Sequence, residues 1–137
     1  MSTRSRIGIL NLDGSVTSIY CHSDGYLSGV GKALLDHYMN EAKVRGLMGL
    51  GDLSSLGKDI GEKHDFSAWD NDWCRSYGRD RGEKNVDCRT DVNVQELVVH
   101  SEEYTYVFNP VLSQWFYTNG NHEAPLPRLT VTVIAQE

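Results

Sequence analysis

A hairpin signal near the start of the chain constrains the fold more than any other feature. Residues 6–12 have the pattern of a strand, with Ile7 and Ile9 on one face. Asp13-Gly14 follows, and this pair favours a two-residue turn because tight primed turns need positive φ. Residues 15–21 form the predicted return strand, whose faces carry Val16, Ser18 and Tyr20 on one side and Thr17, Ile19 and Cys21 on the other.

Hydrophobic periodicity and capping residues predict the remaining elements. They are a helix starting near Gly29 after Ser28, a helix from Glu41 to about Met48 capped by Asn40, a short helix after Asp91, and strands at 77–83, 102–108, 114–118 and 129–134. Leu53, Leu56 and Ile60 are expected to anchor a loop or a short helical turn. The predicted fold class is therefore α+β: an antiparallel sheet with two or three helices packed on one face.

Chain length indicates one domain, and the net charge indicates which kind of partner the protein can bind. A chain of 137 residues is expected to form a single domain, 1–137, with an irregular acidic and aromatic insert at about 51–89. The net charge of −6 disfavours direct nucleic-acid binding and suits a basic partner protein. No apolar run is long enough to cross a bilayer. Three cysteines, an odd number, without a secretory segment predict a reducing, cytoplasmic environment and free thiols.

The connection from residue 20 to residue 32 is the first candidate site, for a nucleotide or phosphate ligand. It has glycines, a lysine and polar aromatic side chains at a helix start, where N–H groups and the helix dipole favour an anion. The phosphate-loop spacing is only partly met, and the same glycines can serve simply to turn the chain. The candidate ligand-binding residues are Tyr20, His22, Asp24, Tyr26, Gly29, Gly31 and Lys32.

The sequence gives weaker evidence for a catalytic site or a metal site than for a ligand-binding loop. A cysteine hydrolase would need a nucleophile, a base and an orienting carboxylate, and the candidates for these roles are Cys21, His22 and Asp24. However, Cys21 and His22 are adjacent in the sequence and would point to opposite faces of a strand. The histidines and cysteines lack the short Cys-x-x-Cys spacing of structural zinc sites. We therefore predict no catalytic residues, no metal and no cofactor, and we expect a protein that is not an enzyme.

The acidic, tryptophan-bearing segment 59–73 is the second candidate site. Aromatic side chains beside carboxylates suit contact with a basic protein surface, although a solvated loop held by its aromatic residues would have the same composition. The candidate partner-binding residues are Asp59, Glu62, Asp65, Trp69, Asp70, Asp72 and Trp73.

Several stretches resemble a family of small proteins encoded by bacteriophages and prophages. The main motif runs from Gly14 to Gly31 as GSVxSIYCHxDGYxxGVG, and further similarity lies at Ser5–Ile9, Leu50–Gly57, Tyr77–Glu83, Glu102–Tyr104 and Trp115. The chain departs from the family at Ser23, where tryptophan is typical, and at Leu27, which is often proline. The resemblance implies a phage accessory protein acting in the host cytoplasm, where small acidic proteins often inhibit bacterial defence systems, as anti-CRISPR proteins do.

Two functional hypotheses follow from these observations. The first is a non-enzymatic inhibitor that binds a host defence protein, such as a CRISPR effector, through the acidic segment. The second is a small nucleotide or phosphate-ligand binding protein that uses the loop at 20–32. The sequence leaves the oligomeric state open.

Overall fold

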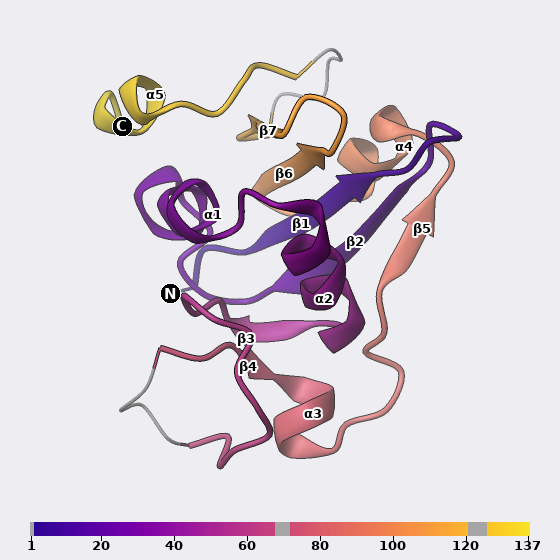
Figure 1. The fold of residues 1–137 in the computed structure, drawn as a ribbon, viewed down its shortest axis with the longest axis vertical. Coiled ribbons are helices and arrows are strands. Elements are labelled where there is room, and N and C mark those ends of the chain that lie inside the picture. Colours follow the sequence, from indigo (N-terminus) through magenta and orange to yellow (C-terminus); the bar gives the residue numbers. More distant parts are fainter. Residues whose placement is uncertain (1, 68–71, 121–125) are drawn as a thin grey trace.

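A single mixed sheet forms the centre of the computed structural model, which describes residues 2–67, 72–120 and 126–137 (Figure 1). The strand order is β4-β3-β2-β1-β6-β7, and β5 pairs separately with β2. Most strand pairs are antiparallel, and the predicted α+β class is confirmed. The strands are β1 (Ser5–Leu10), β2 (Val16–Cys21), β3 (Leu53–Ser55), β4 (Arg75–Ser76), β5 (Arg89–Asp91), β6 (Tyr104–Asn109) and β7 (Gln114–Thr118).

The predicted hairpin is present, but its loop is one residue longer than expected. Strands β1 and β2 pair from Ser5 opposite Cys21 to Leu10 opposite Val16. The N–H of Asn11 then bonds the carbonyl of Ser15 at 2.8 Å, which leaves a loop of three residues, 12–14. Gly14 has a φ of 89°, as a three-residue hairpin requires at its last loop position. The expectation of a two-residue turn is wrong by this one residue.

Two strand pairs are parallel, which the sequence did not predict. Strand β1 pairs in parallel with β6, and β2 pairs in parallel with β3. Parallel neighbours need a crossover connection, commonly helical. Between β2 and β3 this connection contains a π-helical turn, η1 (Leu27–Gly31), and the helices α1 (Lys32–His37) and α2 (Glu41–Leu50).

The main core lies between one face of the sheet and these helices. The side chains of Ile7, Ile9 and Ile19 from the hairpin pack with Leu34 of α1 and with residues of α2. As predicted, Asn40 caps α2: its side chain accepts the N–H of Lys43 at 2.7 Å. Figure 1 shows α2 in front of β1 and β2.

A smaller core on the opposite face is covered by α4 (Val94–Val99). Leu97 and Val98 of this helix pack against Val16 and Val107 of the sheet. The cap of α4 is Asn93, two residues after the predicted Asp91. Helices therefore cover one face as predicted, and one further helix covers part of the other.

Two segments predicted as strands are helices. They are α3 (Tyr77–Arg81) and α5 (Val131–Ala135). In each case a hydroxyl side chain before the helix, Ser76 or Thr130, accepts an N–H of the first turn and stabilises the helical start. Helix α5 also packs Val133 and Ile134 against the main core, and this tertiary contact overrides the strand preference of β-branched residues.

The segment from residue 51 to residue 89 adds strands to the sheet. Leu53–Ser55, expected as a loop or helical turn, is β3, and it pairs with β4. Figure 1 shows this pair and α3 at the end of the molecule far from α5. Within the described ranges, no helix combines the length and the hydropathy that a bilayer crossing requires.

Candidate functional site

The structure divides the seven candidate ligand-binding residues between different surroundings. Tyr20 and His22 are joined on one face, where the Tyr20 hydroxyl lies 2.7 Å from His22 Nδ1. Asp24 and Tyr26 form a separate exposed pair, 3.2 Å apart. Lys32 extends outward to Asp36, its neighbour one helical turn away. The loop therefore does not gather these side chains around one ligand.

Close packing requires a glycine at Gly29 and favours one at Gly31. A Cβ at Gly29 would lie 2.3 Å from the carbonyl oxygen of Asp24, a distance that real contacts do not reach. Asp24 itself has a φ of 56°, so the chain turns sharply here. A Cβ at Gly31 would lie 3.3 Å from the hydroxyl of Tyr106. The alternative interpretation, that these glycines allow the chain to turn and pack, fits this geometry.

The helix start after this loop binds an anion from within the chain. The Glu137 carboxylate accepts the N–H of Leu27 at 2.7 Å and the N–H of Ser28 at 3.0 Å. Burial acts to raise the pKa of Glu137, but hydrogen bonds from Ser28 and Leu27 outweigh it and leave that pKa below its ordinary value. The donors predicted to hold a ligand phosphate are thus bound by a side chain of the protein.

The acidic segment presents its carboxylates at the surface. Asp59 and Asp72 are each 69% exposed and form loose ion pairs, Asp59 with Lys43 at 3.5 Å and Asp72 with Lys58 at 3.6 Å. Glu62 and Asp65 are also exposed. Trp69 and Asp70, the other acidic-segment candidates before Trp73, lie outside the described residues.

Trp73 is packed into the protein. A Cβ at Gly61, which has a φ of 70°, would lie 2.2 Å from the Trp73 ring, so the backbone of the segment lies directly against the indole. The ring of His64 meets the indole edge-on, with 5.7 Å between ring centroids. Trp73 therefore holds the segment in place and differs in role from the exposed carboxylates.

A buried charged network beneath the acidic segment was missed at the sequence level. The Asp80 side chain is fully buried and accepts the N–H groups of His64 and Ser76 and the guanidinium of Arg79. Burial alone would raise the pKa of Asp80, but these hydrogen bonds outweigh it and hold that pKa below its ordinary value. Arg79 also donates to the carbonyls of Ile60 and Cys74, so the network ties the acidic segment to β4 and α3.

Two of the three cysteines are buried in the main core. Cys21 and Cys74 are fully buried and Cys88 is exposed. Burial raises the pKa of the Cys21 thiol to about 12, which keeps it protonated and unreactive. His22 points to the opposite face of the strand, as predicted. The structure therefore separates the Cys21 thiol from the His22 imidazole, in agreement with the argument against a catalytic group at these residues.

The face opposite α1 and α2 contains a second polar cluster, which we call the Arg6 site: Arg6, Ser18, Tyr20, His22 and Arg89. Arg6 is only 8% exposed, and it lies directly opposite Tyr20 in the hairpin. Its Nε donates to Ser18 Oγ at 3.0 Å and its Nη2 donates to the Ser18 carbonyl at 3.1 Å. Arg89 of β5 lies opposite Ser18 on the other side.

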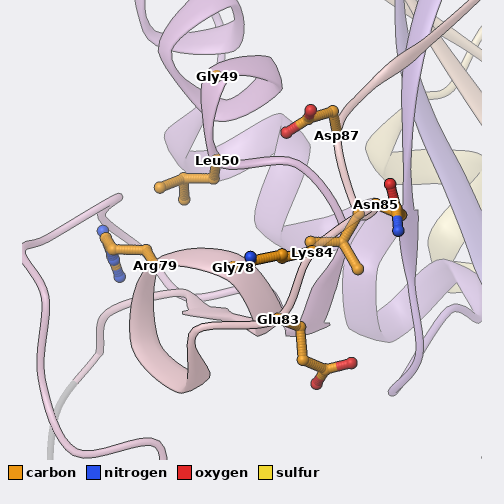
Figure 2. A pocket seen from close by; sticks show the side chains of 9 residues that line it. Gly49, Leu50, Gly78, Arg79, Glu83, Lys84, Asn85 and Asp87 are labelled. Atoms are coloured by element: carbon orange, nitrogen blue, oxygen red, sulfur yellow. The ribbon is translucent and has the colours of Figure 1, made fainter.

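Open pockets lie elsewhere on the molecule. Figure 2 shows one between the end of α2, α3 and the connection after it, lined by Gly49, Leu50, Gly78, Arg79 and residues 83–87. The Arg79 side chain points away from this pocket because it is bound to Asp80. A second, shallow pocket is lined by Gly29, Lys32 and Asp72, so it joins the loop to the acidic segment. Its charged side chains are largely paired with one another.

Comparisons with known proteins give no relative. No family model matches the chain, and no curated protein or solved structure matches it either. Among residues 2–67, 72–120 and 126–137, no group of three or more histidine, cysteine, aspartate or glutamate side chains is placed to hold a metal ion. His122 lies outside these ranges.

Proposed function

We propose that this protein is a non-enzymatic inhibitor that binds a basic surface of a bacterial defence protein, as anti-CRISPR proteins do. The observation that carries the proposal is the display of exposed carboxylates on the described part of segment 59–73, which the Asp80 network anchors at residues 60 and 64. The resemblance of the chain to phage and prophage proteins supports a role in the cytoplasm of an infected bacterium.

The exposed carboxylates are the contact groups in this proposal. Asp59, Glu62, Asp65 and Asp72 are solvent-exposed, and the ion pairs of Asp59 and Asp72 with lysines are long. Exposed pairs of this kind contribute at most about 1 kcal/mol, so a partner's arginines can replace the lysines at little cost. Complementary charge also steers association and raises its rate.

The buried network below the segment makes this surface suitable for binding. Because Asp80 and Arg79 fix the backbone of residues 60 and 64 to α3, these two positions are held in place before a partner arrives. A preordered surface loses less conformational entropy on binding than a disordered one.

Affinity capture from bacterial lysate tests the proposal. We expect the full chain to retain a host protein at low salt and to lose it at high salt. A variant with Asp59, Glu62, Asp65 and Asp72 changed to lysine should retain none. A control with the same charge change at exposed carboxylates elsewhere should capture as the wild type does; its positions are Glu41, Asp87, Glu96 and Glu103. Equal capture by both variants would contradict the proposal.

A second candidate function is binding of a small nucleotide or phosphate ligand. The observation that favours it is the Tyr20–His22 pair beside the buried Arg6. Because Glu137 takes the N–H groups of Leu27 and Ser28, such a ligand would use this face of the sheet and not the helix start.

A further inference from the structure

The Arg6 guanidinium is a buried cation whose hydrogen-bonding capacity is only partly used. In the described residues it donates to Ser18 alone, through Nε and Nη2, and forms no ion pair with a carboxylate. A guanidinium has five N–H donors in a fixed planar fork, so about three remain without a protein acceptor. Burying a charge is costly unless it is paired and hydrogen-bonded.

The free donors of Arg6 are open to the surface. Among the described residues, the side-chain polar atoms that are both sealed from solvent and without a partner are Ser5 Oγ and His64 Nε2. The Nη1 atom of Arg6 is therefore reachable, although only 8% of the residue is exposed. With so little of the residue exposed, a small ligand can meet the guanidinium more easily than a broad protein surface can.

A second cation stands on the same face. Arg89 and Ser18 are cross-strand partners, and partners in an antiparallel pair share a face. Arg89 is bound to Asp91 at 3.2 Å and to the carbonyl of His100. Burial and the charge of Arg89 lower the pKa of Arg6, and the more distant carboxylates of the site, Asp52, Asp91 and Glu102, only partly oppose this.

Tyr20, the cross-strand partner of Arg6, and His22, which is bonded to Tyr20, add polar aromatic groups to the same face. If His22 Nδ1 accepts the Tyr20 hydroxyl hydrogen, the ring proton is on Nε2, and the imidazole presents a further donor. Both side chains are half-buried; Tyr20 belongs to β2 and lies opposite Arg6, and His22 follows directly after the end of that strand. The site thus combines the planar fork of Arg6, a second guanidinium that is paired with Asp91, and the Tyr20–His22 pair, with Asp52 and Glu102 as further carboxylates at its edge.

We propose that the Arg6 site binds a small oxyanion, a phosphate or a carboxylate, in a bidentate contact with the Arg6 guanidinium. The fork geometry of arginine matches both groups. This site does not depend on the acidic segment, so it stands or falls independently of the proposed inhibitor function.

Titration with three probes tests the proposal and distinguishes a phosphate ligand from a carboxylate ligand. Sodium phosphate, adenosine monophosphate and sodium acetate are each added at constant ionic strength, with sodium chloride as the control. We expect the thermal midpoint to rise with probe concentration for at least one of them, because a ligand of the native state stabilises it by mass action. Amide shifts in a nitrogen-15 NMR spectrum should change at β1, β2 and β5.

Substitution of the arginine supplies the specific control. Arg6→Met should weaken binding of the active probe about tenfold or more, since it removes a charge-assisted contact. Arg128→Met removes one charge at an exposed position and should leave the affinity unchanged. If Arg6→Met fails to fold, Arg6→Lys retains the charge but loses the fork, and it should also bind more weakly.

Three results would overturn the proposal. They are the absence of a midpoint change with every probe, NMR shifts confined to the helix start at Leu27 and Ser28, and equal affinity in the Arg6 variants and the wild type. Binding by acetate but not by phosphate would identify a carboxylate ligand, and the reverse would identify a phosphate.

Discussion

The buried Asp80 network gives the most demanding prediction about stability. Asp80→Asn replaces a fully buried carboxylate that accepts N–H groups from Arg79, His64 and Ser76. The amide nitrogen of asparagine would then face at least one of these donors, and the Arg79 charge would lose its partner. Breaking a buried pair costs about 3–5 kcal/mol. Because Arg79 is 16% exposed, water can replace part of its contacts, so we expect about 3 kcal/mol.

Urea unfolding followed by circular dichroism measures this loss directly. A decrease of about 3 kcal/mol corresponds to a fall of roughly 10 °C in the thermal midpoint of a domain this size. The control is Asp72→Asn. The Asp72 carboxylate is 69% exposed, so this substitution should change the free energy of unfolding by no more than about 0.5 kcal/mol.

The stabilisation by Asp80 should also depend on pH. The pKa of Asp80 is lowered in the folded state, so its contribution to the free energy of unfolding is present above pH 3.8 and is lost as pH falls through the folded pKa. Equal stability of the two variants at neutral pH would refute this reasoning.

Two further predictions concern thiol reactivity and the anion at the helix start. Cys88 should react quickly with a thiol reagent in the native state, whereas buried Cys21, with a pKa of about 12, should react only after unfolding; rapid modification of both thiols would show that the core is open. Glu137→Gln should lower stability by less than about 1 kcal/mol, because the carboxylate is largely exposed. The lowered Glu137 pKa means that this contribution is present above pH 4.5 and is lost as pH falls. A variant as stable as the wild type from pH 3 to pH 7 would count against the contact with Leu27 and Ser28.

Local signals in the sequence predicted the elements that local interactions determine. Asn40 and the apolar spacing after it identify α2 because the cap and the amphipathic side belong to one short stretch. The alternation in 102–108 and 114–118 likewise identifies β6 and β7. Strand β3 was missed because three residues are too few to establish a period, and its place in the sheet depends on β2 and β4.

The Arg6 site was missed because of one residue in the first loop. A two-residue loop at Asp13-Gly14 would place Arg6 opposite Cys21, on the buried side of the return strand. The three-residue loop places Arg6 opposite Tyr20, and a shift of one residue moves every side chain to the other face. Asn11, which directly precedes the observed loop, is a residue type common in turns and was the available signal.

In the acidic segment, the sequence did not show which side chains are buried and which are exposed. Its composition indicated carboxylates and tryptophans but did not assign their separate roles. Trp73 is packed against Gly61, whereas the described aspartates and glutamates of the segment are exposed. The network below them joins His64 to Asp80, which are sixteen residues apart in a stretch without periodicity, so only the folded structure shows it.

Phage plating on a defence-proficient bacterial host tests the central claim most directly. The host would express the wild type, the variant with lysine at Asp59, Glu62, Asp65 and Asp72, or the control with lysine at four exposed carboxylates elsewhere. We expect the wild type and the control to restore plating of a restricted phage and the acidic-segment variant to fail. If wild type and both variants restore plating equally, or if the wild type restores none on hosts carrying CRISPR or other defence systems, the proposed function is contradicted.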